Sequence, residues 1–69
     1  MTIVQHKVLQ FIKEYIAEHG YSPSHEEMAQ ALDMHTSTTS RVVSALAQRG
    51  YVEKVGRWRN IKLRPQAAA

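Results

Sequence analysis

The chain has 69 residues, a length that builds one small domain near the lower limit for independent folding. It is 43% hydrophobic and contains no cysteine, which excludes disulfides and thiolate metal sites. The net charge is a mild +3, no apolar run is long enough to cross a membrane, and no signal sequence opens the chain. We therefore expect a cytoplasmic protein with one modest core.

The first predicted element is a helix over residues 3–19. Thr2 and Gln5 have the spacing of a capping box at its start. Apolar residues then recur at three- and four-residue steps along one face, namely Val4, Val8, Phe11, Ile12, Tyr15 and Ile16. Gly20 stands where helices end in the left-handed conformation, and Pro23 predicts an extended connection after it.

A second helix of about nine residues is predicted after Ser24, which has the spacing of another capping box with Glu27. Such a short helix is not stable alone, so its apolar face has to pack against neighbouring helices. Residues 33–35 then form a three-residue turn, since Asp33 tolerates a left-handed backbone.

A third helix is predicted from a cap at Thr36 to about residue 49, where Gly50 ends it. Its inner face consists of Thr39, Val42, Val43, Leu46 and Ala47. Five consecutive hydroxyl residues open this helix, although Ser and Thr are poor helix formers that together weaken it by roughly 2–3 kcal/mol. Because a small protein has little stability to spare, we expect these hydroxyl residues to have a function.

The pattern then alternates, which predicts strands over residues 51–55 and 58–64 around a two-residue turn at 56–57. This register places Val52 opposite Ile61, against the helices, and Lys54 opposite Arg59. We expect the domain to occupy residues 1–65, followed by a disordered tail over residues 66–69.

This order of elements is typical of a three-helix winged helix-turn-helix, a mainly α fold with a small β-hairpin. The second helix of a helix-turn-helix enters the major groove of DNA with its N-terminal residues at the base edges. The hydroxyl run lies at that end, where small side chains allow the backbone to come close to DNA. The residues expected to read bases are Ser37, Thr38, Ser40 and Arg41.

The charge is unevenly distributed along the chain. Residues 1–40 carry two basic and five acidic groups, a net charge of −3, whereas residues 41–69 carry seven basic groups and one acidic group, a net charge of +6. This division favours an oriented contact with a polyanion such as double-stranded DNA. Lys54 and Arg59, if directly opposed, would destabilise the hairpin unless phosphates lay beside them. The residues expected to contact phosphates or sugars are Thr36, Lys54, Arg57, Trp58 and Arg59.

Plainer interpretations of these features stay open. The hydroxyl run can be a cap followed by inert surface, and Arg41 can balance the acidic residues of the second helix. Trp58 can fold back onto the core, and the basic half can be an ordinary solvated face.

An enzyme, a metal site and a cofactor site are not expected. The four histidines, His6, His19, His25 and His35, lack the spacing of metal ligands. The three glycines stand at the ends of elements and not in a phosphate-binding loop, and no serine stands in a nucleophile elbow.

Three segments resemble the N-terminal DNA-binding domain of LexA-type SOS repressors: "GYSPSHEEMAQALDM", "TTSRVVSALAQRGYVEK" and "RNIKLRP". The resemblance covers roughly residues 3–65 and extends to winged-helix regulators in general. It implies that the third helix lies in the major groove and the hairpin on the DNA backbone. It carries a recognition role to the four base-reading candidates and adds Ser24 as a phosphate contact.

The chain also departs from that family. Asp33 stands where the family usually has glycine, and the turn into the third helix is one residue shorter, so the operator preference is not transferred. The self-cleaving C-terminal domain of LexA-type repressors, which also dimerises, is absent from these residues. We expect either an excised domain or a small stand-alone regulator, for example from a phage or plasmid.

The sequence therefore predicts a sequence-specific regulator of transcription, with repression as the expected sign, acting as two copies on a palindromic or repeated site. The alternative is a winged-helix module that docks on a host regulator or polymerase, with residues 55–58 as its anchor. Binding to DNA that weakens as salt rises would distinguish the first function from the second.

Overall fold

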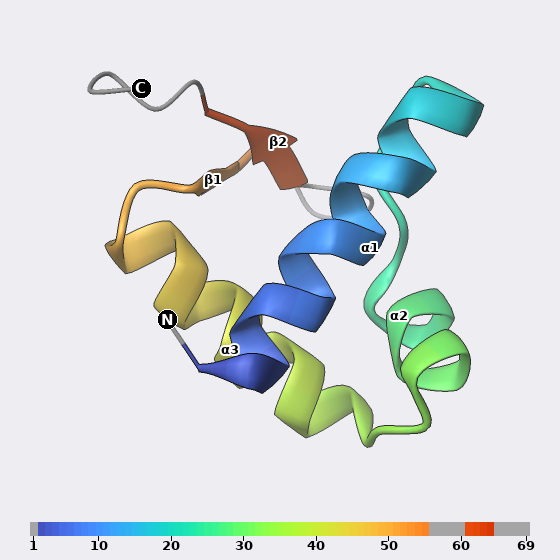
Figure 1. Ribbon diagram of the computed structural model, residues 1–69, viewed down its shortest axis with the longest axis vertical. Helices are drawn as coiled ribbons and strands as arrows, with labels where there is room; N and C mark the ends of the chain where they lie inside the picture. Colours follow the sequence, from blue (N-terminus) through green and yellow to red (C-terminus); the bar gives the residue numbers. More distant parts are fainter. Residues whose placement is uncertain (1, 56–60, 65–69) are drawn as a thin grey trace.

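The computed structural model describes residues 2–55 and 61–64, within which the chain forms three α-helices followed by an antiparallel pair of strands (Figure 1). The elements in chain order are α1 (Ile3–His19), α2 (His25–Leu32), α3 (Thr36–Gln48), β1 (Val52–Lys54) and β2 (Ile61–Leu63). This arrangement confirms the predicted winged helix-turn-helix. No helix in the described ranges is long and apolar enough to cross a membrane.

Capping boxes fix the starts of α1 and α2, as the sequence predicts. Thr2 Oγ1 accepts a hydrogen bond from the Gln5 N–H at 3.0 Å, and the Gln5 side chain accepts one from the Thr2 N–H. Ser24 Oγ accepts from the Glu27 N–H at 3.1 Å, and the Glu27 carboxylate accepts from the Ser24 N–H. Each capping box therefore satisfies two backbone N–H groups, that of the N-cap residue and that of the third helical residue.

Left-handed residues end the same two helices. Gly20 has a φ of 83° after α1, and Asp33 has a φ of 55° after α2. The N–H of Met34 then donates to the Ala29 carbonyl at 2.8 Å, which closes the end of α2. The predicted turn over residues 33–35 is confirmed, with Asp33 providing its left-handed residue.

The start of α3 differs from the prediction by one residue. His35, and not Thr36, occupies the N-cap position with extended dihedral angles (φ −79°, ψ 151°), and its carbonyl accepts the Thr39 N–H. Thr36 is already helical, and its side chain does not cap the helix. The prediction of Thr36 as the cap is therefore wrong, because helical geometry already begins at Thr36, directly after the extended His35.

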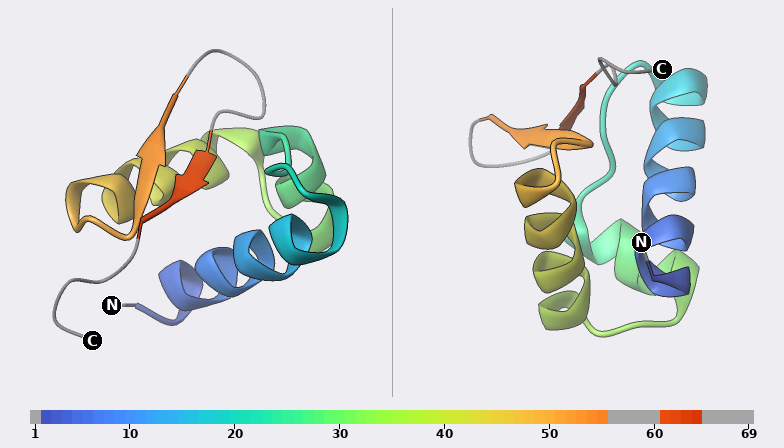
Figure 2. Two further views of the ribbon diagram at one scale, coloured as in Figure 1. Left: turned by 90° about the horizontal axis from the view of Figure 1, so that it is seen from above. Right: turned by 60° about the vertical axis from the view of Figure 1, so that its left-hand side comes forward.

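One core joins all the described elements. Figure 2 shows how the three helices and the hairpin are arranged around it. Its buried apolar side chains are Val8, Leu9 and Ile12 of α1, Met28 of α2, Val43 and Leu46 of α3, Val52 of β1 and Ile61 of β2. Thr39 is also fully buried, and its hydroxyl donates to the Thr36 carbonyl at 2.8 Å, so the polar group is satisfied. The core holds α3 between the other two helices and the hairpin, since α3 contacts α1, α2 and β1.

The strand register is shifted by two residues from the predicted one. Val52 pairs with Leu63 and Lys54 pairs with Ile61, so the predicted pairing of Val52 with Ile61 is wrong. The predicted opposition of Lys54 and Arg59 is wrong for the same reason. Both Val52 and Ile61 are buried in either register, because side chains alternate with a period of two. The predicted turn at 56–57 and the tail over 66–69 lie outside the described residues.

Candidate nucleic-acid interface

The side of α3 opposite the core carries the residues that the sequence predicts to read bases. Ser37, Ser40 and Arg41 are exposed, and Thr38 is half-buried. Thr39 alone among its neighbours turns inward, because α3 packs through that side against the rest of the core. Short hydroxyl side chains and one arginine thus line the solvent-facing surface of the first turns of α3.

The N-terminal end of α3 also differs from those of α1 and α2. Both of the other helices have side-chain caps, whereas α3 has none. The first N–H groups of a helix have no partner within the helix, and together with the helix dipole they favour an anion. This end of α3 is therefore suited to lie against a phosphate group, with Thr36 and Ser37 beside it.

Arg41 is the long hydrogen-bond donor of this surface. It is exposed and forms no ion pair with any residue of the described ranges, so it does not balance the acidic groups of α2. A guanidinium in this position can donate to two acceptors of a guanine, or to a phosphate.

The hairpin meets α3 at Ser44. Lys54 Nζ donates to Ser44 Oγ at 2.8 Å, which brings the ammonium of β1 against the middle of α3. Ser44 is not among the site residues predicted from the sequence, although it lies one helical turn beyond Ser40 and Arg41, a spacing that identifies it as part of the same face. We refer to Ser37, Ser40, Arg41, Ser44 and Lys54 as the outer-face cluster.

His25, the first residue of α2, lies near the same ammonium. Burial, and secondly the Lys54 cation, lower the pKa of His25 below its ordinary value, so its imidazole is neutral at neutral pH. Its Nδ1 is buried and has no hydrogen-bond partner within residues 2–55 and 61–64. Lys54 thus lies close to both helices of the helix-turn-helix.

The described residues that are predicted to contact phosphates differ in their exposure to solvent. Thr36 and Lys54 are exposed at or beside α3. Ser24 is only 8% exposed, and its oxygen caps α2, although no described residue accepts its hydroxyl hydrogen. The remaining predicted contacts to phosphate or sugar lie outside the described residues; they are Arg57, Trp58 and Arg59. The described part of the chain contains no group of three side chains able to hold a metal ion.

Comparisons with known proteins show the family to which the chain is similar. A family model described as the LexA DNA binding domain matches residues 1–59. The LexA repressor of Erythrobacter litoralis is 41% identical over 56 residues, which cover 80% of this chain and 24% of the relative. The LexA repressor of Syntrophobacter fumaroxidans is 38% identical over 63 residues, 90% of this chain and 30% of the relative.

The chain therefore spans about a quarter to a third of the length of the curated relatives that it matches. The matched residues include α1, the complete helix-turn-helix and β1, and so contain the whole outer-face cluster. The resemblance noted in the sequence is confirmed. This chain belongs to the LexA DNA-binding domain family.

Proposed function

We propose that this chain binds double-stranded DNA sequence-specifically and represses transcription, with α3 lying in the major groove. The observation that carries the proposal is the outer-face cluster, in which short hydroxyl side chains and an arginine with no ion pair among the described residues face away from the core. Short side chains allow a helix to approach base edges closely, and arginine can recognise guanine through two hydrogen bonds. Repression is supported by the matched relatives, which are LexA repressors.

Within this proposal, base reading and backbone contact belong to different residues. The base-reading residues are Ser37, Thr38, Ser40 and Arg41. The proposed contacts to phosphate or sugar are Ser24, through its hydroxyl hydrogen, with Thr36, Lys54, Arg57, Trp58 and Arg59. Backbone contacts of this kind set affinity and orientation, whereas base contacts set the sequence preference.

We also propose that two copies act together on a palindromic or repeated site. One domain presents a single recognition helix, which reaches only a few base pairs. Dimeric helix-turn-helix proteins place their two recognition helices about one turn of DNA apart, roughly 10 base pairs between half-site centres. The expected operator therefore has two half-sites with a spacing close to this value or a multiple of it.

Selection of bound duplexes from a random-sequence library tests this function. The wild-type chain should enrich a consensus, and Arg41→Ala should alter the preferred base at one or two positions of each half-site. Lys13→Ala removes an exposed cation from α1, outside the outer-face cluster, and should retain the wild-type consensus. If the wild-type chain enriches no sequence, the proposal is wrong.

A further inference from the structure

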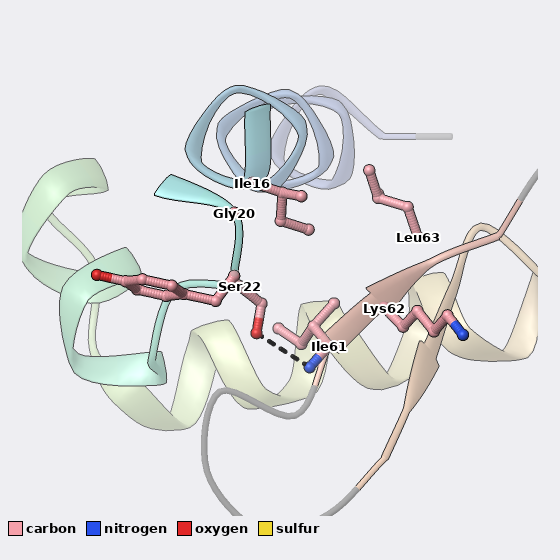
Figure 3. A pocket seen from close by; sticks show the side chains of 7 residues that line it. Ile16, Gly20, Ser22, Ile61, Lys62 and Leu63 are labelled. Carbon is pink, nitrogen blue, oxygen red and sulfur yellow. Dashed lines mark hydrogen bonds between the residues drawn. The ribbon is translucent and has the colours of Figure 1, made fainter. Parts of the chain in front are cut away.

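Two side-chain hydrogen bonds attach the hairpin to the helical part of the domain. On the β2 side, Ser22 Oγ accepts from the Ile61 N–H at 3.2 Å, beside a pocket between the end of α1 and β2 (Figure 3). Ser22 and Ile61 are 3% and 4% exposed, so this attachment lies in the interior. On the β1 side, Lys54 Nζ donates to Ser44 Oγ at 2.8 Å, and this bond lies on the surface.

The position of the hairpin does not depend on the surface bond. Val52 and Ile61, one from each strand, are buried in the core and hold the hairpin on the helices. Within the described ranges the Ser44 side chain makes one hydrogen bond, the one to Lys54. Alanine is the best helix former, so Ser44→Ala should keep the fold and change what the Lys54 ammonium contacts.

The alternation of β1 explains why Lys54 reaches α3. Val52 is buried against the helices, and Lys54, two residues later, lies on the same side of the strand. Glu53, between them, lies on the opposite side. The strand therefore directs the ammonium toward α3, where Ser44 provides an acceptor.

Ser44 continues the exposed face that begins at the first turns of α3. It lies four residues after Ser40 and three after Arg41, which places it about 6 Å along the helix axis from Ser40. The ammonium on Ser44 is thus beside the residues proposed to read bases. Lys54 is exposed and forms no ion pair in the described ranges, where only one of its three N–H donors is used.

A lysine side chain that is already held in place loses less conformational freedom on binding than a mobile one does. Its four-carbon stem is flexible, and ordering such a side chain at an interface opposes binding. The bond to Ser44 orders Lys54 in the free chain, against the helix that is proposed to enter the major groove.

We propose that Ser44 is a positioning residue for DNA binding, whose hydroxyl oxygen holds the Lys54 ammonium on the outer face of α3 so that Lys54 contacts a phosphate of the duplex that Arg41 reads. This inference rests on the proposed function. Because Ser44 acts through a phosphate contact, its loss should lower the affinity for every sequence and leave the base preference of α3 unchanged.

The test measures dissociation constants of the selected duplex, and of a scrambled duplex of the same composition, for Ser44→Ala, Lys54→Ala and the double variant. We expect Ser44→Ala to weaken binding of both duplexes by about 2–10-fold, the range that corresponds to ordering one long side chain. In the Lys54→Ala background, Ser44→Ala should have little further effect, since the ammonium that it positions is absent. Ser44→Thr keeps the hydroxyl acceptor and should bind like the wild-type chain.

Two results would overturn the positioning role and leave the proposed function intact. One is a loss from Ser44→Ala that is just as large in the Lys54→Ala background, which would indicate a direct contact of Ser44 with DNA. The other is wild-type affinity of Ser44→Ala although Lys54→Ala weakens binding. Wild-type affinity of Lys54→Ala would contradict the phosphate contact of Lys54 together with the role of Ser44. A wild-type chain that binds neither duplex would contradict the proposed function itself.

Side-chain NMR relaxation of the free chain provides a check that needs no DNA. The methylene groups of Lys54 should be more ordered than those of Lys13, which is exposed on α1. Ser44→Ala should remove this difference. A Lys54 side chain as mobile as that of Lys13 in the wild-type chain would overturn the inference.

Discussion

Lys54 illustrates how the role of a single side chain depends on its partner. Its ammonium bonds Ser44 on α3 and lies near His25 at the start of α2, so it belongs to the surface of the helix-turn-helix. The predicted register would have placed it beside Arg59, as one of two opposed cations. In the observed register Lys54 lies opposite Ile61, and its ammonium is directed at Ser44 of α3.

Arg41 should affect recognition without affecting stability. Because it is exposed and forms no ion pair in the described ranges, Arg41→Ala should change the free energy of unfolding by less than about 0.5 kcal/mol. Loss of a base contact should reduce discrimination between the selected duplex and a single-base variant by about 1–3 kcal/mol. Thermal unfolding and competition binding measure the two quantities. An equal loss of affinity for every duplex would assign Arg41 to a phosphate instead of a base.

His25 should make the stability of the domain depend on pH. Because its pKa is lowered in the folded state, the folded chain binds fewer protons at this site than the unfolded chain does. Its contribution to stability is complete above the unfolded pKa of about 6.5 and is lost as the pH falls below that value. His25→Gln should therefore reduce the fall in the free energy of unfolding between about pH 7 and pH 5. Urea unfolding at each pH measures this, and an unchanged pH dependence would contradict the assignment.

At the scale of elements, the helices could be predicted because their end signals are local. The capping boxes at Thr2 and Ser24 and the left-handed positions at Gly20 and Asp33 each depend on residues within one turn. The start of α3 was less well determined, because its N-cap, His35, lies directly before the hydroxyl run and forms no side-chain cap hydrogen bond. The hairpin register could not be predicted, because a shift of two residues leaves the same side chains facing the core.

The candidate site also has a part that could be predicted from local sequence and a part that could not. The exposed residues of α3 followed from helical periodicity alone, as Ser40 and Arg41 illustrate. The contacts that join the hairpin to the helices did not, because the Lys54–Ser44 bond spans 10 residues and the Ile61–Ser22 bond spans 39. Such bonds depend on tertiary packing, for which neither sequence segment carries a local signal.

The turn between α2 and α3 gives a prediction about an element boundary. Asp33 has a φ of 55°, a conformation that glycine adopts without steric penalty and that a β-branched residue strongly disfavours. Asp33→Gly should raise the free energy of unfolding by up to about 1 kcal/mol, whereas Asp33→Val should lower it by about 1–2 kcal/mol. Urea unfolding of the two variants tests the turn, and equal stabilities would contradict the importance of this backbone conformation.

For the whole molecule, the acidic and basic parts of the chain correspond to different structural elements. The residues with a net charge of +6 begin at position 41 within α3 and continue through the hairpin, whereas α1 and α2 come from the acidic part of the chain. The helices α1 and α2 provide the scaffold against which α3 packs. This arrangement produces an oriented field that would attract a nucleic acid toward α3 and the hairpin.

The central claim is that the outer-face cluster binds DNA sequence-specifically. Titration of the chain with the selected duplex, and with a scrambled duplex of the same composition, at several salt concentrations tests it most directly. We predict that the selected duplex binds at least about 10-fold more tightly and that both affinities fall as salt rises, because bound cations displace counterions from the phosphates. Equal affinities for the two duplexes, or affinities that do not change with salt, would contradict the account.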